Sequence, residues 1–359
     1  MTPWTLGLVA IATAFFAGGL VWPARWLAFR LGAVDSPGGR RVHAQPTPRL
    51  GGIAIYGAVT LGLFVALVVG SKLELATFSN PRGAIGFALG ATLVFGVGVF
   101  DDVRGLSARI KLIAQMVAAT IVVGFGGCLI TTLSIPWGAS VELGWFAVPA
   151  TVARLVFVTN AVNLLDGLDG LAAGVTALAL GAIVLINGPS HGSVTLVSVA
   201  LIGACVGFLL HNRHPASVFM GDSGSLFLGF SLAVLSTYAS AKRAAGVVTV
   251  IPLLVLALPL ADAVWAIGRR YVRGLIPTST RAYIVAITRI FVPDRLHIHH
   301  RLVDAGLSQR QAVYVLYGVQ VAACVVAVAA AYSVASTTGE EHQHPEAPVL
   351  QGPKLGALP

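Results

Sequence analysis

The chain has 359 residues, of which 56% are hydrophobic and 10% are charged, and its mean hydropathy is +0.85. This composition excludes an ordinary soluble globular protein and is typical of a membrane protein with many spanning segments. The 23 basic residues outnumber the 14 acidic ones. In such a protein a basic excess indicates cytoplasmic loops before it indicates an anionic ligand.

Apolar runs of spanning length recur along the whole chain, since a transmembrane helix needs about 17 to 25 mostly apolar residues. The runs are 4–22, 51–69, 84–100, 110–127, 145–164, 170–187, 194–211, 223–240, 247–267 and 311–334. They predict an all-α polytopic membrane protein of about ten transmembrane helices. We expect one membrane domain over residues 1–334 and a polar, disordered tail over 335–359. The first run lacks a preceding basic segment and a cleavage site, so we expect it to be retained.

Basic residues gather in every second loop. If the N-terminus is outside, the loops that fall inside are 23–50, 101–109, 165–169, 212–222 and 268–310, and together they hold most of the arginines. The positive-inside rule makes this face cytoplasmic and leaves both termini outside. The same orientation places the acidic motifs on the cytoplasmic face. On the outer side, residues 128–144 predict a short hairpin.

The first inside loop, 23–50, contains too much proline and glycine in its second half for a regular helix. Its arginines are explained by the positive-inside rule as readily as by a ligand. We take Arg40 and His43 from this loop as candidate substrate contacts.

Two adjacent carboxylates, Asp101 and Asp102, follow the third apolar run. Neighbouring acids repel each other unless a cation lies close to them. A metal ion or Lys111, a few residues further on, would supply the positive charge. The alternative is a solvated pair of acids at a helix end.

Residues 160–170 carry two amides, Asn160 and Asn163, and two carboxylates, Asp166 and Asp169, between two apolar runs. Acids at such positions usually face protein, water or a metal ion. The last three of these residues recur at intervals of three, so they would lie near one face if this stretch were helical. A short solvated loop is the alternative.

Asp222 opens the run that follows the inside loop 212–222. It is either the N-cap of that helix or a ligand for a divalent cation at the helix N-terminus. Phe219, three residues earlier, is either an interfacial aromatic side chain or a surface on which a base stacks.

The longest inside loop, 268–310, ends with His297, His299, His300 and Arg301. Three histidines in four positions suggest a metal by composition, but the spacing lacks the cysteines or the His-Glu-x-x-His pattern of a zinc site. The many arginines of the loop favour contact with phosphate instead.

Carboxylates with an amide suit Mg²⁺, with Mn²⁺ as an alternative, because these hard cations prefer oxygen ligands and keep positions for substrate phosphates. Arginine and histidine suit the remaining phosphate charge. A site at the membrane–water boundary suits one lipidic and one aqueous substrate. The sequence thus predicts phosphoryl transfer between a soluble diphosphate and a lipid phosphate.

Five motifs in this order resemble the polyprenyl-phosphate N-acetylhexosamine-1-phosphate transferase family, which includes the phospho-MurNAc-pentapeptide translocase. The motifs are Asp35-x-Pro37 with Pro48-Arg49-x-Gly51-Gly52, Asp101-Asp102, Asn160-x-x-Asn163-x-x-Asp166-Gly167-x-Asp169-Gly170, Phe219-Met220-Gly221-Asp222 and His297-x-His299-His300. The resemblance extends over the chain up to about residue 334.

The resemblance implies a role for each acidic position. Asp222 is the expected main Mg²⁺ ligand, with Asn163 as a second. Asp101 and Asp102 resemble the paired acids near the attacking phosphate, where they act as a base or orient the metal. Asp166 is a further catalytic candidate.

The resemblance also implies how the substrates are held. Lys111 is similar to a lysine that contacts phosphate, and Asp169 and Phe219 match positions that hold and stack uracil. His299, His300 and Arg301 match residues near the sugar diphosphate, with His299 also a catalytic candidate. Asn160 and His297 complete the expected substrate contacts.

The implied activity is transfer of N-acetylglucosamine 1-phosphate from a UDP-sugar to undecaprenyl phosphate at the cytoplasmic face of a bacterial inner membrane, with release of UMP. It would open a cell-envelope polysaccharide pathway. The expected partners are the UDP-N-acetylhexosamine, the lipid phosphate and the bilayer, with no nucleic acid and with a homodimer left open. The His-x-His-His form followed by Arg301-Leu302 resembles the N-acetylglucosamine branch, whereas the translocase has three consecutive histidines followed by Phe-Glu.

Several alternatives stay open. The sugar could be N-acetylgalactosamine or MurNAc-pentapeptide, and the route could pass through an aspartyl-phosphate instead of a direct attack on the β-phosphorus. A secondary transporter would place acids near the mid-bilayer in repeated halves, which this sequence does not do. A prenyltransferase that moves the lipid itself would need two Asp-rich clusters of wider spacing and no uridine site.

Overall fold

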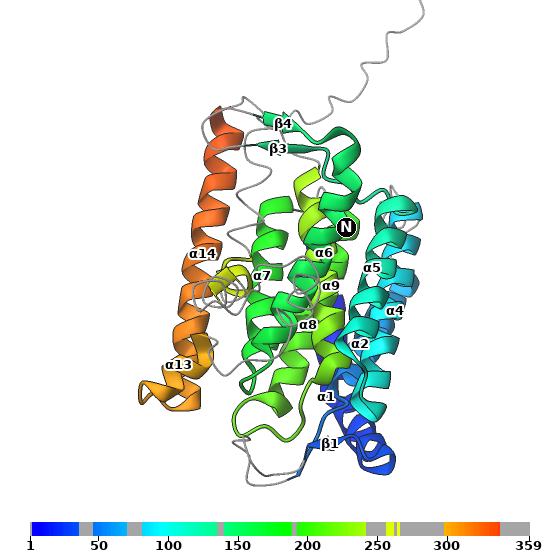
Figure 1. Ribbon diagram of the computed structural model, residues 1–359, viewed down its shortest axis with the longest axis vertical. Coiled ribbons are helices and arrows are strands. Elements are labelled where there is room, and N and C mark those ends of the chain that lie inside the picture. Colours follow the sequence, from blue (N-terminus) through cyan, green and yellow to red (C-terminus); the bar gives the residue numbers. More distant parts are fainter. Residues whose placement is uncertain are drawn as a thin grey trace, which may run out of the picture.

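The computed structural model describes residues 2–35, 46–69, 81–134, 140–188, 192–241, 256–261, 264–265 and 298–337, and it is mainly helical (Figure 1). The longer helices are α1 (Pro3–Leu31), α2 (Gly51–Val69), α4 (Pro81–Arg104), α5 (Ala108–Gly124), α6 (Ala147–Leu165), α7 (Leu171–Asn187), α8 (Gly192–Asn212), α9 (Gly221–Ala241) and α14 (Gln309–Thr337). Shorter elements are η1 (Gly144–Phe146) and α13 (Ile298–Asp304).

Two short antiparallel ribbons mark opposite ends of the helical bundle. Strands β1 (Val34–Asp35) and β2 (Thr47–Pro48) pair with each other, and so do β3 (Thr132–Ser134) and β4 (Ser140–Glu142). Figure 1 shows β1 and α13 at one end, here called the β1 end, and β3 with β4 at the other, here called the β3 end. The second ribbon confirms the hairpin predicted for residues 128–144.

Six of the described helices are long and apolar enough to cross a membrane, namely α1, α2, α4, η1 with α6, α8 and α14. Each predicted span other than 247–267 coincides with a described helix, and most of 247–267 lies outside the described residues. The chain is therefore a polytopic α-helical membrane protein. Helix α14 runs to Thr337, and the boundary between the membrane domain and the tail stays a prediction.

Local sequence signals explain where several helices begin and end. Thr2 accepts a hydrogen bond from Thr5 N and precedes Pro3, which suits a first helical position. Gly32 ends α1 in a left-handed conformation with φ of 71°. Between α4 and α5 the chain turns through three residues, and Ser107 caps α5 by accepting from Ile110 N at 3.4 Å.

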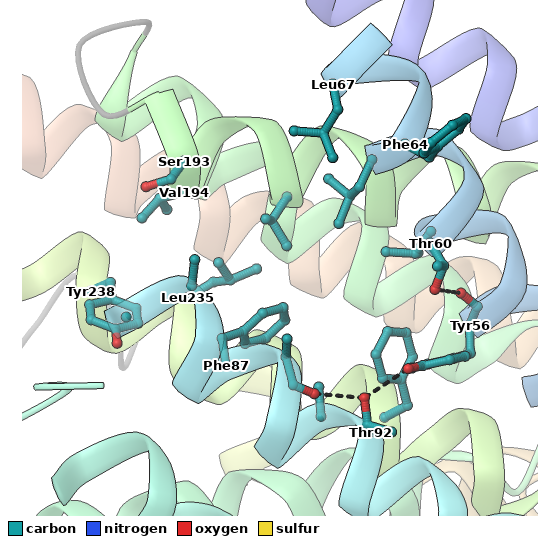
Figure 2. Close-up of a pocket in the computed structure, with 18 residues that line it drawn as sticks. Tyr56, Thr60, Phe64, Leu67, Phe87, Thr92, Ser193, Val194, Leu235 and Tyr238 are labelled. Atoms are coloured by element: carbon teal, nitrogen blue, oxygen red, sulfur yellow. Dashed lines mark hydrogen bonds between the residues drawn. The ribbon is translucent and has the colours of Figure 1, made fainter. Parts of the chain in front are cut away.

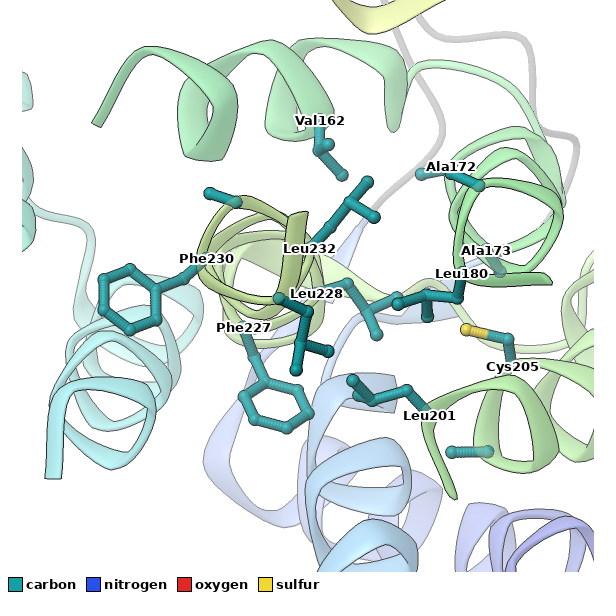
Figure 3. Packing of buried hydrophobic residues seen from close by; sticks show 14 of the residues in the cluster. Val162, Ala172, Ala173, Leu180, Leu201, Cys205, Phe227, Leu228, Phe230 and Leu232 are labelled. Carbon is teal, nitrogen blue, oxygen red and sulfur yellow. The ribbon is translucent and has the colours of Figure 1, made fainter. Parts of the chain in front are cut away.

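Helix α9 lies at the centre of the apolar core (Figure 3). Its side chains point toward several neighbouring helices: Leu228 toward α7, Leu232 toward Val162 of α6, and Phe230 toward α4. A Cβ on Gly90 of α4 would lie 2.8 Å from the Phe230 ring, so the lack of a side chain at Gly90 leaves room for that ring. A helix that is apolar all round belongs in a core, and this one carries its first turn to the β1 end.

An apolar cavity of about 490 Å³ lies between α2, α4, α8 and α9 (Figure 2). Several of its hydroxyl groups are bonded within the protein: Tyr56 pairs with Thr92 at 2.8 Å, and Thr60 donates to the Tyr56 carbonyl oxygen at 2.9 Å. The walls therefore offer mainly hydrocarbon. The ionisable side chains gather elsewhere, at the β1 end.

Candidate active site

Lys111 joins carboxylates from two different helices at the β1 end. Its Nζ lies 3.1 Å from Asp101 Oδ2 of α4 and 2.6 Å from Asp222 Oδ2 of α9. The Lys111 and Asp222 side chains are each 25% exposed, so the cluster is reachable from outside the bundle while much of it is shielded from water. A positive charge between two acids favours their ionised forms. Lys111 was one of two predicted sources of positive charge for the Asp101–Asp102 pair, and in the structure it contacts Asp101 and Asp222.

The tight turn between α4 and α5 sets one half of this cluster. Asp101 Oδ1 accepts a hydrogen bond from Leu106 N at 2.6 Å, and Gly105 adopts a positive φ of 72°. Because α5 begins directly after the turn, Lys111 in its first turns returns to Asp101. The contact between Lys111 and Asp222 instead depends on the tertiary packing of α9 against both helices.

Asp102 holds the N-terminus of α9. It is 3% exposed, and its two carboxylate oxygens accept from Asp222 N at 2.8 Å and from Ser223 N at 3.0 Å. The first amides of a helix lack partners within the helix, so a carboxylate of α4 caps α9 from outside. The interpretation of Asp222 as the N-cap is therefore wrong: Asp222 lies inside the first turn, and Asp102 supplies the cap.

Glycines allow this close approach of α4 to α9. Gly221 has φ of 69°, and a Cβ there would lie 2.6 Å from Asp102 Oδ2 and 2.1 Å from the Arg49 carbonyl oxygen. A Cβ on Gly98, one turn before Asp102, would lie 2.5 Å from Ser223 Cα. Side chains at these positions would push the two helices apart.

The motif Pro48-Arg49-x-Gly51-Gly52 pairs by backbone with the segment just before α9. Phe219 N donates to the Pro48 carbonyl oxygen at 2.8 Å, and Gly51 N donates to the Phe219 carbonyl oxygen at 3.0 Å. Gly52 N donates to the Met220 carbonyl oxygen at 2.9 Å. Two motifs that are far apart in the sequence thus form one unit that fixes Phe219 and the start of α9.

Asn163 approaches the same first turn of α9 from α6. Its Nδ2 donates to Ser225 Oγ at 3.2 Å, and Ser225 Oγ donates to the Gly221 carbonyl oxygen at 3.0 Å. This contact uses the amide nitrogen and leaves the side-chain oxygen for other partners. Ser225 was not identified from the sequence, where only its place one turn after Asp222 hints at a role.

Asp166 caps the end of α6, which stops at Leu165. Of the two alternatives for residues 163–169, the single helical face is not the one observed, because the chain turns over 166–170 and Gly170 adopts φ of 81°. Burial raises the pKa of Asp166 to about 8, and the negative charges of Asp222 and Asp102 add to the rise. Asp166 is thus electrostatically part of the acidic cluster.

Asn160 lies one turn before Asn163 in α6 and pairs with Gln115 of α5. The Asn160 amide donates to Gln115 Oε1 and to the Val156 carbonyl oxygen, and Gln115 Nε2 donates to Asn160 Oδ1 at 3.4 Å. Gln115 is 2% exposed. The pair joins two helices beneath the acidic cluster, and a contact between Asn160 and substrate stays a prediction.

Asp169 links two loops at the β1 end. Its Oδ2 lies 2.7 Å from His214 Nδ1 and accepts from Ala216 N at 3.2 Å. Gly170 N donates to Asn212 Oδ1 at 3.0 Å. His214 and Asn212 were not singled out as site residues, because nothing in the sequence connects them to an acid more than forty residues away.

The remaining predicted residues fall outside this cluster or outside the described residues. Arg40, His43 and His297 lie outside them, and His299 and His300 lie in α13 without described side chains. Arg301 is exposed and places its guanidinium 5.8 Å from the centre of the Trp265 ring. Helix α13 lies beside α14, on the side of the bundle away from α5 (Figure 1).

Among the residues that the structure describes, no three His, Cys, Asp or Glu side chains form a ready metal cage. Mg²⁺ does not need one, since it is commonly held by one or two carboxylates together with waters and substrate phosphates. Asp222 lies in the first turn of α9 and Asn163 bonds to Ser225, which follows in the same helix, and carboxylate and amide oxygens suit that mode of binding. The donor set fits a divalent cation that arrives with a phosphate substrate.

Comparison with known proteins places this site in a family. The profile described as Glycosyl transferase family 4 matches residues 84–240, the part of the chain from α4 to α9. A relative from Bacillus subtilis, named as a probable undecaprenyl-phosphate N-acetylglucosaminyl 1-phosphate transferase, is 38% identical over 294 residues, which are 81% of this chain and 75% of the relative.

Two further relatives extend the comparison. A decaprenyl-phosphate N-acetylglucosaminephosphotransferase of Mycobacterium tuberculosis is 38% identical over 87% of this chain and 78% of its own length. A phospho-N-acetylmuramoyl-pentapeptide-transferase of Halalkalibacterium halodurans is 39% identical over 54% of this chain and 61% of its own length. The resemblance seen in the motifs is confirmed: the chain belongs to glycosyl transferase family 4, alongside the polyprenyl-phosphate N-acetylglucosamine-1-phosphate transferases.

Proposed function

We propose that this protein transfers N-acetylglucosamine 1-phosphate from UDP-N-acetylglucosamine to a polyprenyl phosphate and releases UMP. The observation that carries the proposal is the cluster of Asp101, Lys111 and Asp222 at one end of a membrane-spanning bundle, in a chain of this family. Such a place can receive a lipid phosphate from the bilayer and a nucleotide sugar from water.

The choice of N-acetylglucosamine rests on the relatives. Those named for N-acetylglucosamine match over 81% and 87% of the chain, whereas the muramoyl-pentapeptide relative matches over 54%. The His297-x-His299-His300-Arg301 sequence supports the same choice. Undecaprenyl phosphate is the proposed acceptor, as in the Bacillus subtilis relative's name.

In the proposed reaction an oxygen of the lipid phosphate attacks the β-phosphorus of the UDP-sugar. The bond between that phosphorus and the bridging oxygen breaks, and UMP leaves with the bridging oxygen. The Lys111 ammonium offsets phosphate charge, since it already faces the open side of the cluster between two carboxylates. A divalent cation held by Asp222 and Asn163 would supply further charge neutralisation.

The acids of the motif orient more than they deprotonate. A phosphate monoester has a second pKa of about 6 and is largely dianionic at neutral pH, so the attacking oxygen needs no strong base. Asp101 accepts from Leu106 N and Lys111, and Asp102 uses both oxygens on the amides of α9. A carboxylate engaged in this way is a poor nucleophile, which favours direct attack over an aspartyl-phosphate.

The β1 end is proposed to be cytoplasmic. Most of the described arginines lie on segments at this end, namely Arg30, Arg49, Arg104, Arg109, Arg213, Arg301 and Arg310, as the positive-inside rule requires. The start of α1 and the end of α14 then lie on the outer side. The proposed location is a bacterial cytoplasmic membrane. A homodimer stays a prediction that sedimentation of the detergent-solubilised protein tests.

The test is release of UMP by the purified protein. UDP-N-acetylglucosamine, UDP-N-acetylgalactosamine and UDP-MurNAc-pentapeptide are offered separately with undecaprenyl phosphate and Mg²⁺. We expect release with the first donor that depends on the lipid. Release without lipid, or a preference for another donor, refutes the proposal as stated.

A further inference from the structure

Helix α14 donates hydrogen bonds to backbone carbonyls in two loops of the β1 end. The Tyr317 hydroxyl donates to the Gly170 carbonyl oxygen at 2.7 Å. Arg310 donates through Nε and Nη2 to the His214 carbonyl oxygen, at 3.1 Å and 2.9 Å. These contacts join α14 to the turn before α7 and to the segment between α8 and α9. Helix α14 itself lies beyond the residues matched by the family profile.

The two loops that α14 holds are already joined to each other. Asp169 binds His214 and Ala216 N, and Gly170 N donates to Asn212 Oδ1. Asn212 also donates through Nδ2 to the Val218 carbonyl oxygen at 2.9 Å, directly before Phe219. The loops therefore form one unit, here called the Asp169 unit, which comprises residues 166–170 and 211–218. A bond from α14 to either loop restrains both.

Two glycines, Gly170 and Gly174, allow the Tyr317 side chain to approach the backbone closely. A Cβ on Gly174 of α7 would lie 2.0 Å from the Tyr317 hydroxyl and 2.2 Å from its Cζ, so the ring lies directly against the helix backbone. Gly170, whose carbonyl accepts the bond, has a positive φ of 81°. On the same side of α14, Ala312, Val313 and Leu316 are buried in the core. The Tyr317 hydroxyl is thus held close to the α7 backbone, by a helix whose neighbouring residues are anchored in the core.

The start of α14 also fixes α13. Ser308 and Gln311 form a reciprocal cap, with Ser308 N donating to Gln311 Oε1 at 2.9 Å and Gln311 N to Ser308 Oγ at 3.3 Å. Only four residues separate α13 from α14, and Gly306 turns there with φ of 98°. Because Arg310 ties this corner to His214, the position of α13 is set relative to the Asp169 unit.

We propose that Tyr317 and Arg310 are positioning residues for the nucleotide-sugar donor. They act through the Asp169 unit and through α13, and neither touches the substrate. This inference rests on the proposed function and on the expectation from the motifs that the uracil lies at Asp169 and Phe219 and the sugar diphosphate near His299. The contacts of Tyr317 with Gly170 and of Arg310 with His214 are here called the clamp. Loosening the clamp raises the KM for the donor and leaves the KM for the lipid acceptor unchanged, because the acceptor meets the Asp101 and Lys111 side of the site.

Tyr317→Phe tests the hydroxyl alone, and the chain contains a matched control. Tyr332 of α14 donates to the Leu185 carbonyl oxygen of α7 at 3.2 Å, so the same two helices share the same kind of bond at the β3 end. We expect Y317F to raise the KM for UDP-N-acetylglucosamine about three- to tenfold, the effect of one neutral hydrogen bond. Y332F leaves that KM at the wild-type value.

Arg310→Gln and Arg310→Lys test the other contact. Both variants lose the paired donation from one guanidinium to one carbonyl, although lysine keeps the charge. We expect both to raise the donor KM with the acceptor KM unchanged. An equal rise in both KM values, or rescue by lysine, contradicts the positioning role, since it indicates general loss of structure or an action through charge alone.

Hydrogen exchange separates the clamp from the proposed reaction. In the substrate-free protein we expect amides in 166–174 and 211–218 to exchange about three to ten times faster in Y317F and R310Q than in the wild type and Y332F. Unchanged exchange in those segments overturns the clamp, whatever the activity. If the wild type shows no transfer while exchange rises as expected, the clamp stands and the proposed function fails.

Discussion

Replacing Asp102 tests whether this acid positions α9 or acts on the substrate. Its carboxylate accepts two backbone hydrogen bonds at 2.8 Å and 3.0 Å and is 3% exposed. Hydrogen bonds to a charged group contribute about 1.5 to 3 kcal/mol each. In Asp102→Asn one oxygen remains, and the new amide group turns a donor toward a backbone donor. The free energy of unfolding should therefore fall by the contribution of one such bond and by the cost of one unsatisfied buried group, together about 3 kcal/mol or more.

A thermal unfolding scan in detergent measures this loss. With an unfolding entropy of about 2.1 cal/mol/K per residue, a decrease of about 3 kcal/mol lowers the midpoint of a 359-residue chain by about 4 °C, which is the shift we expect for D102N. Asp101→Asn is the matched comparison, because Asp101 belongs to a partly buried ion pair and accepts one backbone hydrogen bond instead of two. D101N lowers the midpoint less than D102N does and lowers the turnover number.

The two variants therefore separate stability from chemistry. D102N loses activity in proportion to its loss of folded protein and of an ordered α9 N-terminus, and lowering the temperature restores part of it. If D102N keeps the wild-type midpoint yet abolishes turnover, Asp102 acts directly on the substrate. That result would refute the capping role derived from its two backbone contacts.

Three further predictions concern the same cluster. Gly98→Ala places a Cβ 2.5 Å from Ser223 Cα, whereas Gly96, on the same helix, has no atom within 4 Å of its Cβ; G98A should lower both the melting midpoint and the activity, and G96A should keep both. A stable, active G98A would contradict the close packing of α4 on α9. Lys111→Gln should reduce kcat/KM by about 100-fold or more, as for loss of one preorganised electrostatic contact, while the neighbouring exposed Arg109→Gln stays near wild type; similar losses in both would indicate a diffuse field instead of a specific contact. Removal of divalent cations by EDTA should abolish UMP release, and Mg²⁺ or Mn²⁺ should restore it; transfer that persists in EDTA would exclude the proposed metal.

Much of the architecture follows from local features that a single sequence contains. Apolar runs of spanning length predict the helices because each run must satisfy its own backbone hydrogen bonds in lipid. The turn residues between 128 and 144 predict the β3–β4 hairpin. Asp101 and Lys111 are ten residues apart across a short helix–helix turn, so their meeting was also within reach of sequence reasoning.

The turn over 166–170 shows where periodicity misleads. Asn163, Asp166 and Asp169 have helical spacing, but Gly167 and Gly170 end the helix, and Gly170 needs a positive φ. The spacing allowed a helical face and the glycines allowed a loop, so the sequence left both alternatives open. Asp169 consequently faces His214, where it joins two loops, instead of lying in line with Asn163.

The sequence by itself determined a helical membrane protein and where most of its described helices lie, and it predicted residue types that suit a divalent cation and phosphates, because these depend on composition and on contacts within about ten residues. Only the tertiary structure decided that Lys111 meets Asp222 across 111 residues, that Asp102 caps α9, and that Tyr317 reaches Gly170 across 147. The physical reason is that these contacts depend on which helix packs beside which, and that order comes from many weak contacts along whole helix faces, among them glycines whose missing side chains set how closely the backbones approach.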